Sequence, residues 1–171
     1  MTKTTTILRV NENGNLLAYS FADIMHYHGF GYPGGVTHAF KSMELALPLL
    51  DNGNPPERRE IGIETPFRGP GGRDAFEMVT RCVTEGNFTV DAALMKPERG
   101  EVLKGYVFNF LYRGTRVNLQ IREGHVREDF IALGRKPDRT AEEEAHLVTL
   151  KQEMTDRLMV LPATEIYEVV E

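Results

Sequence analysis

The amino-acid sequence predicts an α+β fold, with helices packed on one mixed or antiparallel β-sheet and an amphipathic helix near the C-terminus. Apolar residues recur at helical spacing in the first half of the chain, and the spacing changes to a period of two after about residue 100. The helical spacing then returns after residue 140. We expect a single domain over residues 1–171, with its core at about 20–122 and a C-terminal helix and strand at about 139–171.

The first predicted helix has the sequence SFADIMHYHG, at residues 20–29. Ser20 is a favourable N-cap residue, and Gly29 can end a helix in the left-handed conformation. Helical spacing places His28 on the inward face at the helix end, whereas His26 is rotated away from it. The other residues of this inward face are Phe21, Ile24 and Met25.

Two further helices each follow a glycine-rich loop. The loop GFGYPGG precedes a helix with a buried apolar stripe, and we expect Pro48 to kink this helix or to end it early. The loop PFRGPGGR follows a short strand at residues 59–65 and precedes a helix at residues 74–83. The buried stripe of the earlier helix consists of Val36, Ala39, Phe40, Met43, Leu47 and Leu50.

Most strands are expected in the second half of the chain. Residues 102–112 and 115–121 alternate around Arg113-Gly114 in the pattern of a β-hairpin, and residues 86–94 are predicted to form another strand.

The C-terminal part begins with a charge-rich segment at residues 127–144, which we expect to be a linker. Thr140 and Glu143 then form the capping box of a long helix, and residues 162–170 are predicted to form the closing strand. The apolar stripe of this helix is expected in the core, with the arm of a homodimer as the alternative. Its residues are Leu147, Leu150, Met154 and Leu158.

The composition excludes several classes of function. The chain has 171 residues, of which 41% are hydrophobic and 26% charged, and its net charge is −5. Nucleic acids and anionic membranes both attract basic surfaces, so we expect neither as a partner. The N-terminus lacks an apolar signal segment, and no apolar run reaches the ~20 residues of a membrane span, so the cytoplasm is the expected location. The single cysteine, Cys82, excludes an intramolecular disulfide and an all-cysteine metal site within one chain.

Three of the five histidines lie in the segment MHYHGFGYPGGVTHAF, at residues 25–40. Neutral imidazole binds zinc, nickel, copper and iron, so His26, His28 and His38 are candidate metal ligands. On a helix the side chains of His26 and His28 point about 200° apart, which favours His28 together with His38 across the loop. The competing interpretation is that these are ordinary core or surface histidines.

The two glycine-rich loops are candidate anion sites, because each leads into a helix N-terminus with free N–H groups and a partial positive charge. Arg68 and Arg73 lie in the second loop. Neither loop matches the phosphate-loop or dinucleotide-binding patterns, so plain turn geometry is the competing interpretation. Tyr32, Tyr106 and Tyr112 are candidates to line a pocket, although aromatic residues in strands usually belong to the core. Cys82 would be a ligand only if its helix packs over the histidine loop, and a buried structural thiol is the alternative.

The segment YHGFGYPGGVTHAFKSMELAL resembles the opening of the FmdE-like family, which is named after a component of formylmethanofuran dehydrogenase. Members of this family read F-H-G-H-x-C-P-G before a helix ending in A-E-L-A-L. IGIET and RDAFEMVTRCVTEGNF are similar to the next family segment, and GYVFNFLYRGTRVNL to its strand pair. The resemblance extends from about residue 21 to residue 121. It implies a FwdE/GAPDH domain-like core and a metal-binding site at the histidine loop.

The resemblance carries only part of the family's site over to this chain. The family's first histidine falls on His28, its second on Phe30, and the cysteine before Pro-Gly on Tyr32. Asp74 matches a family aspartate and Cys82 a family cysteine, whereas the cysteine of the second family segment is missing.

Two explanations of these departures remain open. Either the site has become a pocket for an organic ligand, or His28, His38 and an oxygen donor such as Tyr32 form a new metal-ligand set. A histidine-rich set without thiolates suits a divalent transition metal such as zinc, nickel or iron, and less readily a haem-like tetrapyrrole.

These observations predict a metal- or small-ligand-binding protein, expected to be a homodimer. Its site would combine the His28/Tyr32/His38 loop with the Arg68–Asp74 glycine-rich loop. One alternative is a metal-dependent enzyme acting on a small anionic substrate, in which His28 holds the metal or acts as a general base. Another, from the resemblance alone, is an accessory component of a redox complex. The residues expected to contact the ligand are Tyr32, Phe67, Arg68, Arg73, Asp74 and Cys82.

Overall fold

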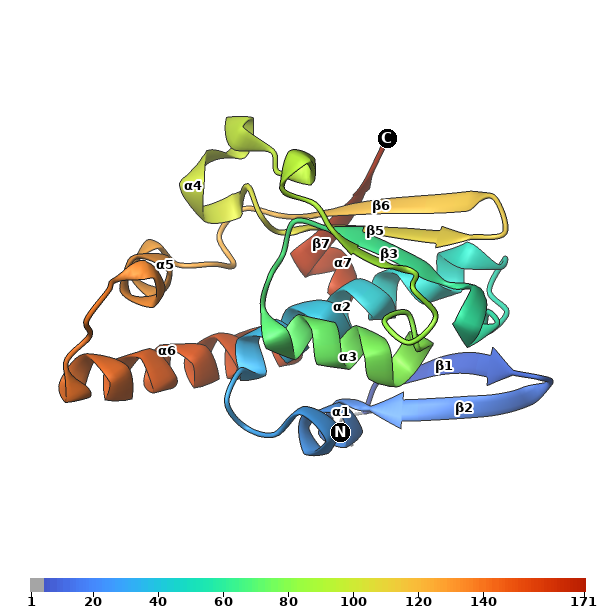
Figure 1. Ribbon diagram of the computed structural model, residues 1–171, viewed down its shortest axis with the longest axis horizontal. Coiled ribbons are helices and arrows are strands. Elements are labelled where there is room, and N and C mark those ends of the chain that lie inside the picture. The colour runs from blue at the N-terminus through green and yellow to red at the C-terminus, as the bar shows by residue number, and fades with distance from the viewer. Residues whose placement is uncertain (1–4) are drawn as a thin grey trace.

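A five-stranded sheet forms one layer of the fold, with the strand order β4-β3-β5-β6-β7 (Figure 1). This computed structural model describes residues 5–171. Strands β3 and β4 are parallel and the other neighbours are antiparallel, so the predicted mixed sheet is confirmed. The strands are β3 (Gly62–Thr65), β4 (Phe88–Val90), β5 (Val107–Tyr112), β6 (Thr115–Ile121) and β7 (Tyr167–Val170).

The long helices pack beneath one face of this sheet (Figure 1). The central helix, α2, contacts β5, β6 and β7, and it also packs against α3 and α6. Buried residues of the helices and the sheet form one hydrophobic cluster, in which Phe40 and Phe108 are fully buried. The helices are α1 (Phe21–His28), α2 (Pro33–Leu50), α3 (Pro70–Thr80), α5 (Glu128–Arg135) and α6 (Ala141–Met159), with the single turns α4 (Gly100–Leu103) and α7 (Ala163–Ile166). Three short 3₁₀ helices are Arg58–Glu60, Ala92–Leu94 and Pro97–Arg99.

Local sequence signals explain where several helices begin and end. Ser20 caps α1 and Thr140 caps α6, and each forms a reciprocal capping box with the acidic residue three positions later. Gly29 follows α1 with a φ of +89°, which glycine adopts without the strain that a side chain would cause. The buried stripes predicted for α2 and α6 are confirmed.

Two helix boundaries differ from the predictions. α2 continues through Pro48 to Leu50, so of the two alternatives for Pro48 the early end is wrong, and the kink stays a prediction. Pro48 lies exposed in the last turn, where only one helical hydrogen bond is lost and water can replace it. α3 begins at Pro70 rather than at residue 74, because proline is favourable at the first position of a helix. Gly71 and Gly72 are therefore part of the helix.

An N-terminal hairpin lies outside the predicted core of residues 20–122. It consists of β1 (Ile7–Glu12) and β2 (Asn15–Ser20), which pair as an antiparallel two-stranded sheet. Asn13 and Gly14 form the turn, and both have positive φ. Asn-Gly between alternating apolar residues is a strong hairpin signal, so the sequence did contain this information.

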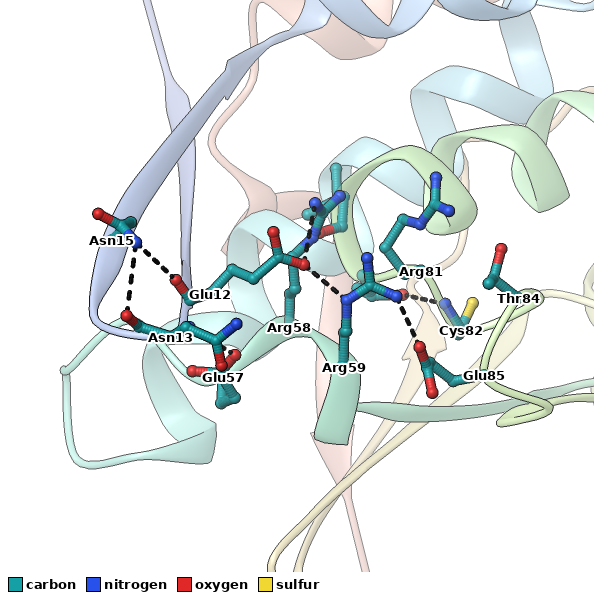
Figure 2. Close-up of polar contacts among 12 residues, drawn as sticks. Glu12, Asn13, Asn15, Glu57, Arg58, Arg59, Arg81, Cys82, Thr84 and Glu85 are labelled. Carbon is teal, nitrogen blue, oxygen red and sulfur yellow. Dashed lines mark hydrogen bonds and ion pairs between the residues drawn. The ribbon is translucent and has the colours of Figure 1, made fainter.

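Two arginines connect this hairpin to the rest of the fold (Figure 2). One guanidinium nitrogen of Arg59 lies 2.6 Å from a carboxylate oxygen of Glu12, and another lies 2.6 Å from one of Glu85. Arg58 is buried and donates to the backbone carbonyl groups of Met78 and Val79 at the end of α3. The hairpin is thus fixed to the end of α3 that lies away from the glycine-rich segment.

The segment at residues 127–144 is more than the linker expected from its charge. It contains α5, which contacts α6 and has no buried residue. Residues 162–170 also differ in part from the predicted strand, since the turn α7 precedes β7. Apolar residues at 130, 131 and 133 are only partly buried, which explains why the charge of this segment dominated the prediction.

Candidate functional site

The two glycine-rich segments meet where α2 and α3 begin. A Cβ atom on Gly35 would lie 3.1 Å from the backbone nitrogen of Gly72, and one on Gly71 would lie 2.5 Å from the carbonyl oxygen of Tyr32. A side chain at Gly71 would force backbone atoms apart, so glycine is required for the two helices to approach this closely. These glycines therefore serve helix packing and not the turn geometry expected from the sequence, because they lie within α2 and α3 and none has a positive φ.

The ring of Phe67 is held against the same segment. A Cβ atom on Gly69 would lie 2.5 Å from this ring, and one on Gly72 would lie 3.1 Å from it. The ring centroid also lies 5.5 Å from that of Tyr106 and 5.6 Å from that of Phe108, which is contact distance for tilted aromatic rings. Glycine backbone and neighbouring rings together fix the position of Phe67.

A pocket of about 460 Å³ opens between these segments, α5 and α6. Its volume lies within the range of ~300–1,000 Å³ that is typical of small-molecule sites. The two helix starts contribute Gly34, Gly35, Gly69 and Pro70 to its wall. Its aromatic lining residues are Tyr32, Phe67, Tyr106 and Phe130.

The charged residues that line this pocket are all cations: Arg68, Arg135 in α5 and Lys151 in α6. Arg135 pairs with the exposed Glu101 at 3.3 Å, whereas no ion pair within residues 5–171 includes Arg68 or Lys151. Four other pockets of the molecule each include a carboxylate among their lining residues. In a chain with a net charge of −5, this pocket has the opposite local charge.

Lys151 extends over the face of Tyr32. Its ammonium nitrogen lies 4.5 Å from the ring centroid, which is the geometry of a cation–π interaction, and it donates to the carbonyl oxygen of Gly31 at 3.4 Å. Partial burial lowers the pKa of Lys151; the charge of Arg139 lowers it further and that of Glu144 opposes the shift. A ligand carboxylate or phosphate at this position would stabilise the charged ammonium group.

His28 and Asp74, both predicted site residues, are in direct contact. Nδ1 of His28 lies 2.8 Å from a carboxylate oxygen of Asp74, and the histidine side chain is only 6% exposed. A carboxylate accepts, so Nδ1 carries the proton that is donated, and Nε2 is an acceptor when the ring is neutral. Nε2 is buried and has no hydrogen-bond partner within residues 5–171, and the ring of Tyr32 lies 5.9 Å away.

His38 has different neighbours from His28. It is 1% exposed, and its Nδ1 shares a hydrogen bond of 2.8 Å with the hydroxyl group of Tyr167. Burial lowers the pKa of His38 to about 3, so the ring is neutral near pH 7. Its ring centroid lies 4.7 Å from that of Tyr106 and 6.4 Å from that of Phe67, which places His38 behind the aromatic wall of the pocket.

His28, Asp74 and His38 do not line this pocket, and three further predicted site residues lie apart from it. His26 is exposed on α1, and Arg73 is exposed on α3 without contributing to the pocket lining. Cys82 lies two residues beyond the end of α3, an 11-residue helix that is about 16 Å long, and the pocket lies at the first residue of this helix. Burial raises the pKa of the Cys82 thiol to about 11, which fits a buried structural thiol.

A metal site made only of protein side chains is not supported by this arrangement. Within residues 5–171, no group of three or more His, Cys, Asp or Glu side chains is placed to hold a metal ion. His28 and Asp74 supply one free imidazole nitrogen and one carboxylate, which do not complete a donor set.

The part of the chain that the structure describes also contains no helix that is long and apolar enough to cross a membrane.

No protein-family model matches the chain, and no curated protein matches it. The resemblance to the FmdE-like family, the metal and the homodimer therefore stay predictions.

Five pocket residues lie outside the segments that sequence reasoning singled out, and Ile131 and Gly134 of α5 are two of them. Phe130 and Arg135 belong to the segment predicted as a linker, and Lys151 lies on the predicted C-terminal helix. No local pattern marks them, because tertiary packing alone brings α5 and α6 to the glycine-rich segments. Tyr106, one of the tyrosines that the sequence offers as pocket candidates, does line the pocket.

Proposed function

We propose that this protein binds a small anionic organic molecule in the pocket between its two glycine-rich segments. The observation that carries the proposal is the presence of three cations, and of no carboxylate, in a pocket of ligand size. Protein cations normally find carboxylate partners, as most cations of this chain do. Arg68 and Lys151 lack one within residues 5–171, and an anionic ligand would supply it.

The His28–Asp74 pair supports a second candidate, an enzyme whose reacting group lies beside the pocket, since neither residue lines the pocket and Nε2 of His28 is buried. A carboxylate that orients a histidine through Nδ1 leaves Nε2 available as an acid or base, which is the arrangement found in many catalytic sites. Metal binding at His28, His38 and His26 remains the further alternative, and elemental analysis of wild type and His28→Ala would test it. Metal in the wild type that disappears in this variant would support that alternative.

Titration of the ¹⁵N-labelled protein with benzoate and with phenyl phosphate tests the binding proposal. We expect the amide signals of Gly34, Gly35 and Gly69 to shift. Arg68→Gln and Lys151→Gln should each weaken binding about tenfold, the effect of losing one charge-assisted contact of roughly 1.4 kcal/mol.

Arg73→Gln is the matched control, because it removes the same charge from the same segment but from outside the pocket lining. It should change affinity by less than about threefold, the effect expected of a screened surface charge. Equal weakening by Arg68→Gln and Arg73→Gln would mean that the anion responds to the general field and does not enter the pocket.

A further inference from the structure

The lining of the pocket also defines the class of ligand, an inference that rests on the proposed function. We infer that the ligand is a flat aromatic molecule, with either one ring or two fused rings, that carries a carboxylate or phosphate group. The aromatic wall would contact the rings, and the three cations would contact the anionic group.

The inner wall presents aromatic surface in a fixed orientation. Phe67 is confined by the backbone at Gly69 and Gly72, and its ring is tilted by 48° against that of Tyr106. Tyr106 is in turn backed by the buried ring of His38. Rings that are already immobilised lose little conformational entropy when a ligand packs against them, so this wall is suited to a rigid, flat partner.

The outer wall presents an aromatic face beside a positive charge. Tyr32 is 48% exposed, and the Lys151 ammonium group lies over its ring. Phe130 of α5 is partly buried and adds a fourth ring. An aromatic anion can place its ring against these faces and its charged group near Lys151 and Arg68, whereas an aliphatic anion of equal size gains only the charge contact and apolar burial.

Four related probes separate the contributions of ring and charge. 2-Naphthoate has both, trans-decalin-2-carboxylate has the same carbon skeleton without aromatic character, and 2-naphthamide has the rings without the charge. 2-Naphthyl phosphate tests the alternative anionic group. By calorimetric or NMR titration, we expect 2-naphthoate to bind about tenfold more tightly than both the decalin carboxylate and the amide, the effect of stacking on two rings or of one charge contact. The ratio of naphthoate to naphthyl phosphate then identifies the head group.

Variants of the wall provide a second, independent readout. Phe67→Leu and Tyr32→Leu keep an apolar side chain but remove a ring, so each should reduce the preference for 2-naphthoate over the decalin carboxylate to about threefold or less. Phe88→Leu on β4 lies outside the pocket and should leave the preference unchanged. Tyr32 is half exposed, so its variant is expected to fold even if Phe67→Leu does not.

Failure of this inference is distinguishable from failure of the proposed function. Equal affinity for naphthoate and decalin carboxylate, with both weakened by Arg68→Gln, would overturn the aromatic class and leave the anion pocket intact. Absence of binding by all three anions would overturn the proposed function itself. An amide that binds as tightly as the naphthoate would show that the cations do not contact the ligand, and would overturn both.

Discussion

Two of the elements that line the pocket, here called its first and second walls, differ in construction. The first is the start of α2 and α3, where backbone meets backbone at Gly35, Gly71 and Gly72 and most residues of α2 are buried. The second is α5, which contributes Phe130 and Arg135 and has no buried residue. The first wall is fixed by close packing, whereas the second rests on a partly buried apolar face and on exposed polar contacts.

The contacts that hold α5 explain why it is the weaker wall. Arg135 pairs with Glu101 at 3.3 Å, and both side chains are more than half exposed. Arg139 donates to the carbonyl groups of Leu133 and Gly134 at the end of the helix. Exposed ion pairs contribute only about 0–1 kcal/mol each. We therefore expect α5 to shift more readily than the glycine crossing, the contact between α2 and α3 at Gly35, Gly71 and Gly72. The proposed ligand site would then combine a preformed wall with an adaptable one, an arrangement that suits ligand entry followed by enclosure.

Hydrogen exchange should reveal the largest difference between the two walls. Amides in the middle of α2, near Phe40 and Met43, should exchange only through global unfolding, whereas those of α5 should exchange through local opening. We expect α5 amides to exchange at least about 100-fold faster, which corresponds to roughly 3 kcal/mol or more. Saturating 2-naphthoate should slow exchange in α5 more than in α2. Equal protection of both helices without ligand would contradict the comparison.

Gly71→Ala should produce the largest effect of a single substitution. Its Cβ atom would lie 2.5 Å from the carbonyl oxygen of Tyr32 and 3.0 Å from the nitrogen of Val36, and these backbone atoms cannot move without separating α2 from α3. We expect a loss of about 3 kcal/mol in the free energy of unfolding, measured by denaturant titration, because overpacking at a rigid contact is costly. A loss below about 1 kcal/mol would mean that the crossing adapts, as α5 is expected to do.

His38 lies behind the aromatic wall of the pocket and should make the free energy of unfolding depend on pH. Burial is the main cause of its low pKa of about 3, and the charges of His125 and Arg157 lower it further. In the unfolded chain His38 binds a proton as the pH falls below about 6.5, whereas in the folded chain it stays neutral. His38 therefore does not reduce the free energy of unfolding above pH 6.5, and it reduces this free energy progressively as the pH falls from 6.5 towards 3. We expect about 3 kcal/mol less stability at pH 4 than at pH 7 from this residue.

The control for this pH dependence is His38→Gln, which retains a side chain able to bond to Tyr167 but does not titrate. Carboxylates elsewhere affect both proteins, so the comparison rests on the difference between their pH profiles. Parallel profiles for wild type and variant would show that the folded protein admits a proton at His38.

The sequence was sufficient for the parts of the fold that depend on local pattern. Periodicity identified α2, α6 and the β5–β6 hairpin, and the capping box placed the start of α6 at Thr140. It was insufficient where packing overrides a local rule. Gly71 and Gly72 were predicted in a loop because glycine weakens an isolated helix, yet contact with α2 makes glycine necessary there.

The residues of the candidate site, like the elements of the fold, were predicted from the sequence only in part. The two glycine-rich segments were identified, and Tyr32, Phe67 and Arg68 line the pocket that they form. The suggestion that His38 joins His28 came from their proximity in sequence, whereas the structure gives each ring different partners, Asp74 for one and Tyr167 for the other. Arg135 and Lys151 reach the pocket from distant segments and could not be identified without the tertiary structure.

The smallest effect is expected from Gly134→Ala, which makes the same chemical change as Gly71→Ala but on the second wall. A Cβ atom on Gly134 would meet nothing within 4 Å. Alanine favours a helix by about 0.5–1 kcal/mol relative to glycine, so exchange in α5 should slow by about two- to fivefold. Because α5 opens locally, the melting temperature should rise by no more than about 3 °C. Opposite signs for the two glycine-to-alanine variants would establish that the walls differ in packing, whereas destabilisation by both would show that α5 is as tightly fixed as the glycine crossing.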